Sequence, residues 1–133
     1  MKNLYELLKH ARFVFVCGNG GSAATAEHFT IDLFSKGIKA ICLNSNTAIM
    51  TMIANDFGYD QVFSRQLDIY ARKKDLLITI SCSGTSQNIV RAIRKAKIIG
   101  LKTYEFETFG KKRDFGELEN RHLQVVHMIT KQL

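Results

Sequence analysis

The chain has 133 residues, of which 46% are hydrophobic and 23% charged, as is ordinary for one globular domain. Its formal net charge of +7 comes from basic residues that are dispersed and not interleaved with aromatic ones, which argues against nucleic acid and suits an anionic small molecule. The apolar runs are too short to span a membrane, and the amino-terminal segment does not resemble a signal peptide. Three cysteines without C-x-x-C spacing predict reduced thiols and a cytoplasmic protein.

Short apolar runs alternate with helical patterns along the chain. Residues 13–17 are continuously apolar and are followed by glycine, which predicts a buried strand. The other expected strands are 39–43, 76–80 and 103–106. Helices are expected over 22–34, where Ser22 is the predicted cap, over 47–56 and 62–73, and over the amphipathic segment that follows Ser86 and ends at Gly100.

Strands that alternate with helices predict an α/β fold, a doubly wound parallel sheet of four to five strands with flanking helices. The fifth strand depends on residues 122–129, whose β-branched side chains favour a strand, with a helix as the alternative. In such sheets ligands bind at the carboxyl ends of the strands. The turns that follow the strands are therefore the first places to search for a site.

A glycine-rich turn, Gly18-Asn19-Gly20-Gly21-Ser22, stands between the first predicted strand and the first long helix. Glycine lets the backbone approach a ligand closely, and a helix start offers unpaired N–H groups with partial positive charge. The turn therefore suits an anion, although turns of this kind also serve as plain connections.

A second turn, residues 81–86, has the sequence Ser-Cys-Ser-Gly-Thr-Ser and precedes the amphipathic helix. Its four hydroxyls can donate to the oxygens of a phosphate monoester without the lysine of a P-loop. A serine-rich turn without a ligand is the alternative. We predict a phosphate site here, formed by Ser81, Ser83, Thr85 and Ser86.

Three segments in this order, GNGGSAATAEHF, ANDFGYDQVFSRQL and ISCSGTSQNIVRAI, resemble the sugar isomerase (SIS) domain family, specifically its phosphoheptose isomerase branch. The resemblance covers residues 13–106. It implies the SIS fold, a homotetramer with active sites between subunits, and a sugar phosphate such as sedoheptulose 7-phosphate as substrate. It also implies that the serine-rich turn holds the phosphate and that the sugar is contacted by Asn19, Ser22 and Asp56, with Gly20 in the same turn.

The resemblance also implies an acid–base pair. In similar isomerases a His and, four residues later, a Glu follow the glycine turn and can hold zinc; here these positions are His28 and Asp32, on one helix face. Asp is shorter than Glu by one methylene, a bond of about 1.5 Å. Because a misplacement of about 1 Å can cost roughly a hundredfold in rate, we expect impaired catalysis.

The family's carboxyl-terminal helix carries Q-x-x-H and a second His eight residues after the Gln. Gln124-Val125-Val126-His127 matches the first part, which makes Gln124 a third candidate zinc ligand, but Gln132 stands where the second His is expected. If 122–129 is a strand, which we favour, this helix is absent altogether. On either interpretation the acid–base histidine is missing.

Two functions stay open. One is a phosphosugar isomerase with impaired catalysis; the other is a non-catalytic binding or scaffold module similar to the DnaA initiator-associating protein, which lacks the catalytic carboxylate. Residues 1–133 are expected to be a single SIS domain, trimmed at both ends relative to the family. Leu4, Leu7 and Leu8 are expected to be exposed and to pack against another subunit of a dimer or tetramer.

Overall fold

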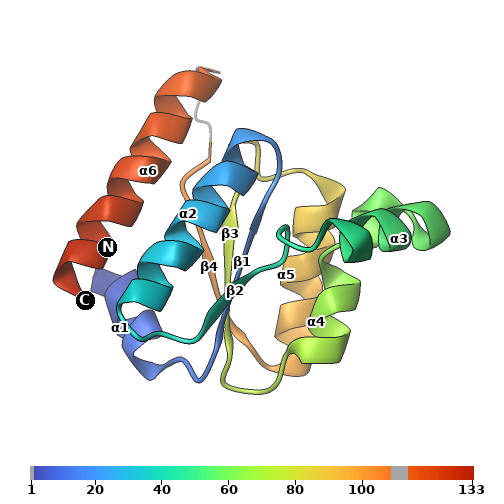
Figure 1. The fold of residues 1–133 in the computed structure, drawn as a ribbon, viewed down its shortest axis with the longest axis horizontal. Helices are drawn as coiled ribbons and strands as arrows, with labels where there is room; N and C mark the ends of the chain where they lie inside the picture. Colours follow the sequence, from blue (N-terminus) through green and yellow to red (C-terminus); the bar gives the residue numbers. More distant parts are fainter. Residues whose placement is uncertain (1, 109–113) are drawn as a thin grey trace.

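The computed structural model describes residues 2–108 and 114–133 as alternating helices and strands (Figure 1). Their bounds are α1 (Lys2–His10), β1 (Val14–Gly18), α2 (Gly21–Ser35), β2 (Ala40–Cys42), α3 (Thr47–Phe57), the 3₁₀ turn η1 (Tyr59–Gln61), α4 (Ser64–Tyr70), β3 (Leu76–Ile80), α5 (Gln87–Ile99), β4 (Lys102–Glu105) and α6 (Phe115–Gln132). The four strands lie within two residues of their predicted bounds. The helix expected over 62–73 is shorter than predicted, because η1 precedes it and α4 ends at Tyr70.

The four strands form one parallel sheet in the order β2-β1-β3-β4, which confirms the predicted α/β class. Val14 of β1 lies opposite Ala40 on one side and Leu76 on the other, and Leu76 in turn lies opposite Lys102. Every residue of β1 and β3 is buried, as their continuous apolar runs predict for central parallel strands.

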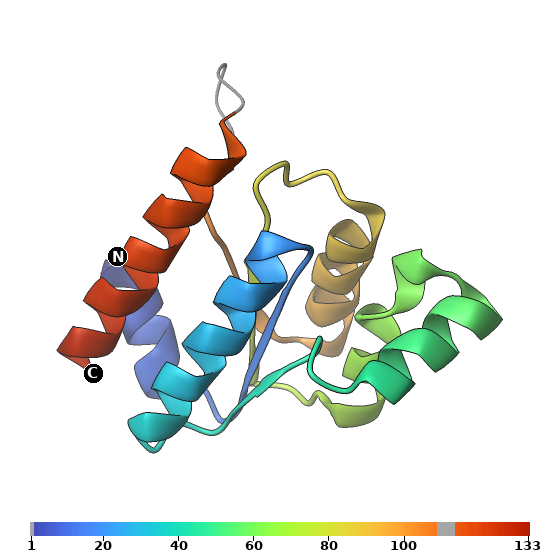
Figure 2. The same ribbon diagram turned by 45° about the horizontal axis from the view of Figure 1, so that its top comes forward.

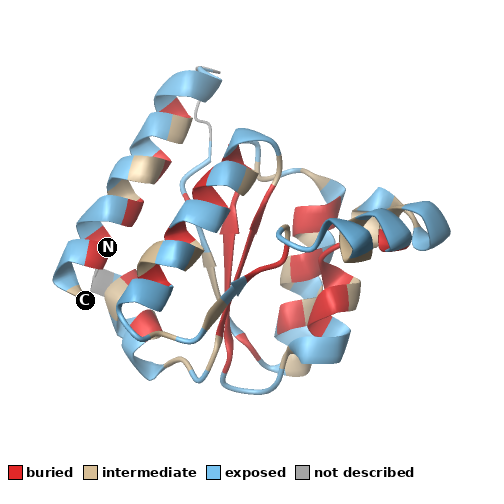
Figure 3. Ribbon diagram, in the orientation of Figure 1, coloured by how far each residue is buried: buried red, intermediate tan, exposed pale blue. Residues whose placement is uncertain are grey.

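Helices cover both faces of the sheet (Figures 1 and 3). Val14 and Val16 point to the face covered by α1, α2 and α6, and their neighbours there include Phe29. Phe15 and Cys17 point to the other face, which is covered by α4 and α5. The alternation along β1 follows from the period of two residues in a strand, and it divides the buried side chains into two layers.

Residues 122–129 lie within helix α6, so the expectation of a fifth strand was wrong. Asp114 caps this helix, since its Oδ1 accepts a hydrogen bond of 2.9 Å from the backbone N–H of Glu117. The buried positions Leu118, His122, Val126 and Ile129 recur at helical spacing. The cap and this buried face outweigh the β propensity of the valines, which is weak and depends on context.

Two of the three amino-terminal leucines are not exposed as expected, and the third, Leu7, is half-buried against the same core. Leu4 is 0% exposed and Leu8 is 2% exposed, and both pack into the chain's own core beneath α6 rather than facing another subunit. Figure 2 shows α1 beside the lower half of α6. None of the helices in residues 2–108 and 114–133 has both the length and the hydropathy needed to cross a membrane.

Candidate functional site

The two predicted anion-binding turns lie side by side. β1 and β3 are adjacent, and Gly18 at the end of β1 pairs with Ile80 at the end of β3. From these two strands the chain proceeds to opposite edges of the sheet, to β2 and to β4. The carboxyl ends of β1 and β3 therefore form the switch point where open α/β sheets bind their ligands.

The glycine turn is tightly packed where it leaves β1. A Cβ on Gly18 would lie 2.5 Å from the carbonyl oxygen of Ser22 and 2.9 Å from that of Ile80, so only glycine fits. Gly20, with φ of 57°, is the residue that precedes α2, and no side chain caps this helix. Ser22 is thus inside the helix and is not the cap that the sequence predicted. Its hydroxyl lies 3.9 Å from the sulfur of Cys82 in the second turn.

The hydroxyls of the serine-rich turn are oriented so that they can donate to an anion. Ser81 Oγ accepts a 3.0 Å hydrogen bond from the backbone N–H of Gly84, and Ser83 Oγ accepts one of 3.3 Å from that of Thr85. Each hydroxyl accepts a bond from the turn and keeps its own hydrogen to donate. Ser86 is the residue before α5, yet its side chain makes no capping bond, so its hydroxyl is also available at a helix N-terminus.

Both turns line one small hollow of about 100 Å³, which we call the serine-lined hollow. Its walls are formed by Asn19, Ser22, Ser81, Cys82, Ser83, Ser86, Phe115 and Glu119. Five of the eight predicted substrate residues are brought together here, whereas Gly20, Asp56 and Thr85 are not among its walls. The hollow is much smaller than the roughly 300–1,000 Å³ of sites that enclose a whole ligand, so it suits a phosphate group.

Cys82 is a wall of this hollow rather than a nucleophile. Burial raises the pKa of the Cys82 thiol, the hydrogen bond with the Ser22 hydroxyl lowers it by a smaller amount, and the carboxylate of Glu119 adds the smallest effect, which raises it. The neutral thiol is therefore favoured, while a reactive cysteine needs the thiolate. Cys17 and Cys42 are buried as the sequence predicted, and burial raises the pKa of both.

Helices α2 and α6 run side by side in the same direction (Figure 2). Any Cβ at Gly21 would overlap the carboxylate of Glu119. Further along the same pair of helices, His127 lies against His28, and the Thr130 hydroxyl lies 3.2 Å from Oδ2 of Asp32. The two helices therefore contact each other at three levels, from the start of α2 beside the serine-lined hollow to its last turn at Asp32.

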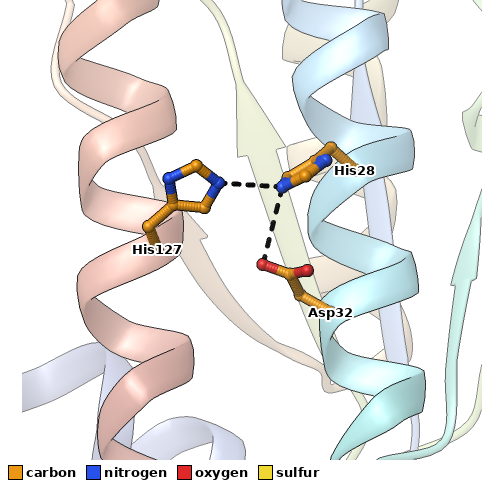
Figure 4. Close-up of side chains that lie close together, drawn as sticks. All are labelled: His28, Asp32 and His127. Carbon is orange, nitrogen blue, oxygen red and sulfur yellow. Dashed lines mark hydrogen bonds and ion pairs between the residues drawn. The ribbon is translucent and has the colours of Figure 1, made fainter.

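His28, Asp32 and His127 form what we call the histidine cluster (Figure 4). The Nε2 atoms of the two histidines are 2.9 Å apart, and His28 Nε2 is 3.7 Å from Asp32 Oδ2. One ligand atom of each residue lies within 4.8 Å of the others. Two imidazoles and a carboxylate are a donor set that catalytic zinc sites use, so these residues fit the zinc ion that the family resemblance implies.

His127 was not predicted as part of the site, and the reason is a shift of five residues in the register of α6. Counting eight residues back from His127 gives Glu119, and three residues after Glu119 stands His122. The segment therefore has the spacing E-x-x-H-x-x-x-x-H, with Glu119 in place of the family's Gln. Gln124, the predicted third ligand, is an exposed residue one turn before His127, and its role stays a prediction.

Comparison with known proteins agrees with this geometry. The SIS domain profile matches residues 1–106. A phosphoheptose isomerase of Helicobacter pylori (strain P12) is 45% identical over 106 residues, which are 75% of this chain and 55% of that protein. The probable phosphoheptose isomerase of Thermoplasma acidophilum is 39% identical over an aligned stretch of 136 residues, which covers 87% of this chain and 75% of that protein.

This chain belongs to the SIS domain family, on its phosphoheptose isomerase branch. It spans about half the length of the Helicobacter relatives that it matches.

Two solved structures extend the similarity of this SIS domain to its carboxyl-terminal helix. The phosphoheptose isomerase of Neisseria gonorrhoeae matches with a TM-score of 0.90 at 26% identity, over 98% of this chain and 80% of that one. That of Francisella tularensis matches with a TM-score of 0.87 at 27% identity, over 98% and 80%. Since nearly the whole chain is covered, the match includes α6, which lies beyond the residues of the SIS domain profile.

Proposed function

We propose that this SIS domain is a phosphosugar isomerase of the phosphoheptose type, acting on a substrate such as sedoheptulose 7-phosphate. The observation that carries the proposal is the approach of His127 to His28 and Asp32, on the same pair of helices that forms part of the serine-lined hollow. Ser22 and His28 are six residues apart on α2, or about 9 Å along the helix axis. That separation suits a substrate that carries its phosphate at one end and reacts at the other.

In the proposed mechanism, the serine-lined hollow holds the phosphate through Ser81, Ser83 and Ser86 and so fixes the position of the sugar carbons. Aldose–ketose isomerisation then needs a base that moves a proton between neighbouring carbons and an acid that serves the oxygens. In the metal-free site, Asp32 and either His28 or His127 are our candidates for these roles. The same three side chains could instead hold a zinc ion, which would polarise the carbonyl oxygen; the histidine nitrogens bound to the ion would then not take part in proton transfer.

We also propose that catalysis is slow, for one of the two reasons that the sequence suggested. The expected loss of a histidine no longer supports it, because His127 lies beside His28. The shorter carboxylate remains. Asp32 is within reach of both His28 and Thr130, so its carboxylate is held between the two helices. A non-catalytic sugar-phosphate-binding module is the second candidate, and the same short carboxylate favours it.

A direct assay separates the two candidates. Sedoheptulose 7-phosphate is incubated with the protein, with and without added zinc, and the aldose product is measured alongside the His127→Ala variant. Turnover that the variant loses supports the isomerase. Binding of sedoheptulose 7-phosphate without any turnover, at any zinc concentration, supports the binding module instead.

We also propose that the protein is a cytoplasmic homo-oligomer, a dimer or a tetramer. Its three cysteines are unpaired and buried, as suits a reducing compartment. Ile31 and Phe34 on the outer side of α2 are 67% and 76% exposed, and they flank Asp32. Apolar side chains beside a candidate site are suited to contact with a second copy. Sedimentation of the Phe34→Lys variant should then show a smaller species than the wild-type protein, whereas a wild-type monomer at micromolar concentration would contradict the proposal.

A further inference from the structure

Asn88, a residue that the sequence did not single out, forms a reciprocal amide pair with Asn19. Asn88 is the second residue of α5 and is 2% exposed. Asn19 Nδ2 donates a 2.9 Å hydrogen bond to Asn88 Oδ1, and Asn88 Nδ2 donates one of 2.8 Å to Asn19 Oδ1. The glycine turn and the start of α5 are thus joined by two parallel bonds between side chains.

Two further donors fix the orientation of both amides. The backbone N–H of Ile89 lies 2.9 Å from Asn88 Oδ1, which identifies that atom as the acceptor. The Tyr59 hydroxyl donates a 3.0 Å bond to Asn19 Oδ1. The oxygen of Asn19 therefore accepts two bonds. Its nitrogen has two hydrogens, and within residues 2–108 and 114–133 only the one bonded to Asn88 is used. Asn19 is also a wall of the serine-lined hollow.

Tyr59 is itself held in place from two sides. It follows Gly58, whose φ of 101° is a conformation that favours glycine, so the chain turns sharply at the end of α3. The next residue, Asp60, forms an ion pair of 2.8 Å with Arg91 of α5. Three elements, the glycine turn, η1 and α5, consequently meet at the carboxamide of Asn19.

We propose that Asn88 and Tyr59 are positioning residues that hold the Asn19 carboxamide so that its second N–H donates to a sugar oxygen of the substrate. This inference rests on the proposed function for the identity of the ligand. A donor that is already oriented loses less freedom when a ligand binds. The hydrogen bonds of Asn88 and Tyr59 to Asn19, which we call the lock, should therefore increase the affinity for the sugar and leave the affinity for phosphate alone unchanged.

A double-mutant cycle measures whether Asn88 acts through Asn19. We expect Asn88→Ala to weaken binding of sedoheptulose 7-phosphate about tenfold in calorimetry and to change binding of inorganic phosphate less than twofold. In the background of Asn19→Ala, the same change should have less than a twofold effect, because the group that it positions is gone. An equal loss in both backgrounds would overturn the proposal.

Two more variants keep the test independent of folding defects. Tyr59→Phe removes one hydroxyl from a side chain that is 55% exposed, and we expect it to weaken sugar-phosphate binding two- to fivefold. Asn46→Ala is the matched control, since it removes the amide cap of α3, which accepts from Ile49, without touching Asn19. It should lower stability and leave binding unchanged. A Tyr59→Phe variant with wild-type affinity would contradict the role of the hydroxyl.

A spectroscopic measurement tests the lock without any ligand. In the free protein, the side-chain amide of Asn19 should give proton resonances that are displaced from those of a free asparagine amide and that exchange slowly with solvent. Asn88→Ala and Tyr59→Phe should move both towards the values of a free amide. Wild-type resonances at the positions and exchange rates of a free amide would refute the lock itself, whereas a protected amide in a protein that binds no sugar phosphate would refute the proposed function instead.

Discussion

His28 Nε2 lies 2.9 Å from His127 Nε2, although the two residues are 99 positions apart in the chain (Figure 4). At that distance one ring must donate the hydrogen and the other must accept it. A metal ion that binds both Nε2 atoms replaces this shared hydrogen, and Asp32 on the same face of α2 supplies a carboxylate oxygen. The contact also shows that His127 is a histidine of α6 that faces α2.

Zinc binding should depend on His127 and not on the carboxyl-terminal glutamines. We expect His127→Ala and His28→Ala each to weaken zinc binding at least tenfold, about 1.4 kcal/mol, because each removes one of three ligands. Competition with a chromophoric chelator measures the change. Gln132→Ala and Gln124→Ala are the controls and should bind zinc as the wild-type protein does. A loss on replacing Gln132 that equals the loss on replacing His127 would favour the other register of α6.

Lengthening the carboxylate at position 32 should increase isomerase activity. The Asp32→Glu variant gains one methylene, about 1.5 Å of reach, so its carboxylate can extend beyond the contacts with His28 and Thr130. We expect kcat on sedoheptulose 7-phosphate to rise about tenfold or more, in keeping with the cost of small misplacements. Asp32→Asn, which keeps the length and removes the charge, should lower it. An unchanged or lower kcat for Asp32→Glu would mean that the aspartate is already well placed.

The central sheet and the position of the serine-rich turn could be predicted from the sequence, whereas α6 could not. β1 and β3 are apolar throughout and end at glycine- and serine-rich turns, so local pattern and buried position agree. In α6 they conflict, because Val125 and Val126 favour a strand while the burial of Leu118, His122 and Ile129 requires a helix. The available signal was Asp114 three residues before Glu117, a helix-start pattern that places Glu119 and His127 on a helix.

The contact between His28 and His127 could not be derived from either helix alone. It depends on α2 and α6 lying side by side in the same direction, which is a property of the packed fold. The same holds for Asn88, since nothing in its neighbourhood along the chain indicates that it meets Asn19 across the sheet end.

Removing hydroxyls from the serine-rich turn should weaken phosphate binding without unfolding the domain. Ser83→Ala with Ser86→Ala removes two wall groups of the serine-lined hollow, and Ser86 makes no capping bond that would be lost. We expect binding of sugar phosphate to weaken at least tenfold, roughly 1.4 kcal/mol, in calorimetry. The matched control is Ser35→Ala with Ser45→Ala, two exposed serines outside the hollow. Equal affinities for the two double variants would contradict the phosphate site.

The glycine at the end of β1 should be irreplaceable, because the added atom would meet backbone on two sides. In Gly18→Ala the new Cβ would lie 2.5 Å from the carbonyl oxygen of Ser22 and 2.9 Å from that of Ile80, and neither can move without displacing α2 or β3. We expect a loss of unfolding free energy of about 1–3 kcal/mol or more. The same displacement separates the two turns, so phosphate binding should fall with stability.

Gly116→Ala is the matched control for this substitution. Gly116 lies in the first turn of α6, where an added Cβ would come no closer than 3.7 Å to Asp114 Oδ1. Since alanine favours the helix over glycine, we expect this variant to gain roughly 0.5–1 kcal/mol. Urea unfolding compares the two, with a lower midpoint at constant slope for Gly18→Ala and a higher one for Gly116→Ala. A midpoint for Gly18→Ala equal to that of the wild-type protein would contradict this prediction. It would mean that the backbone at Ser22 or Ile80 can move away from an added Cβ at little cost in stability.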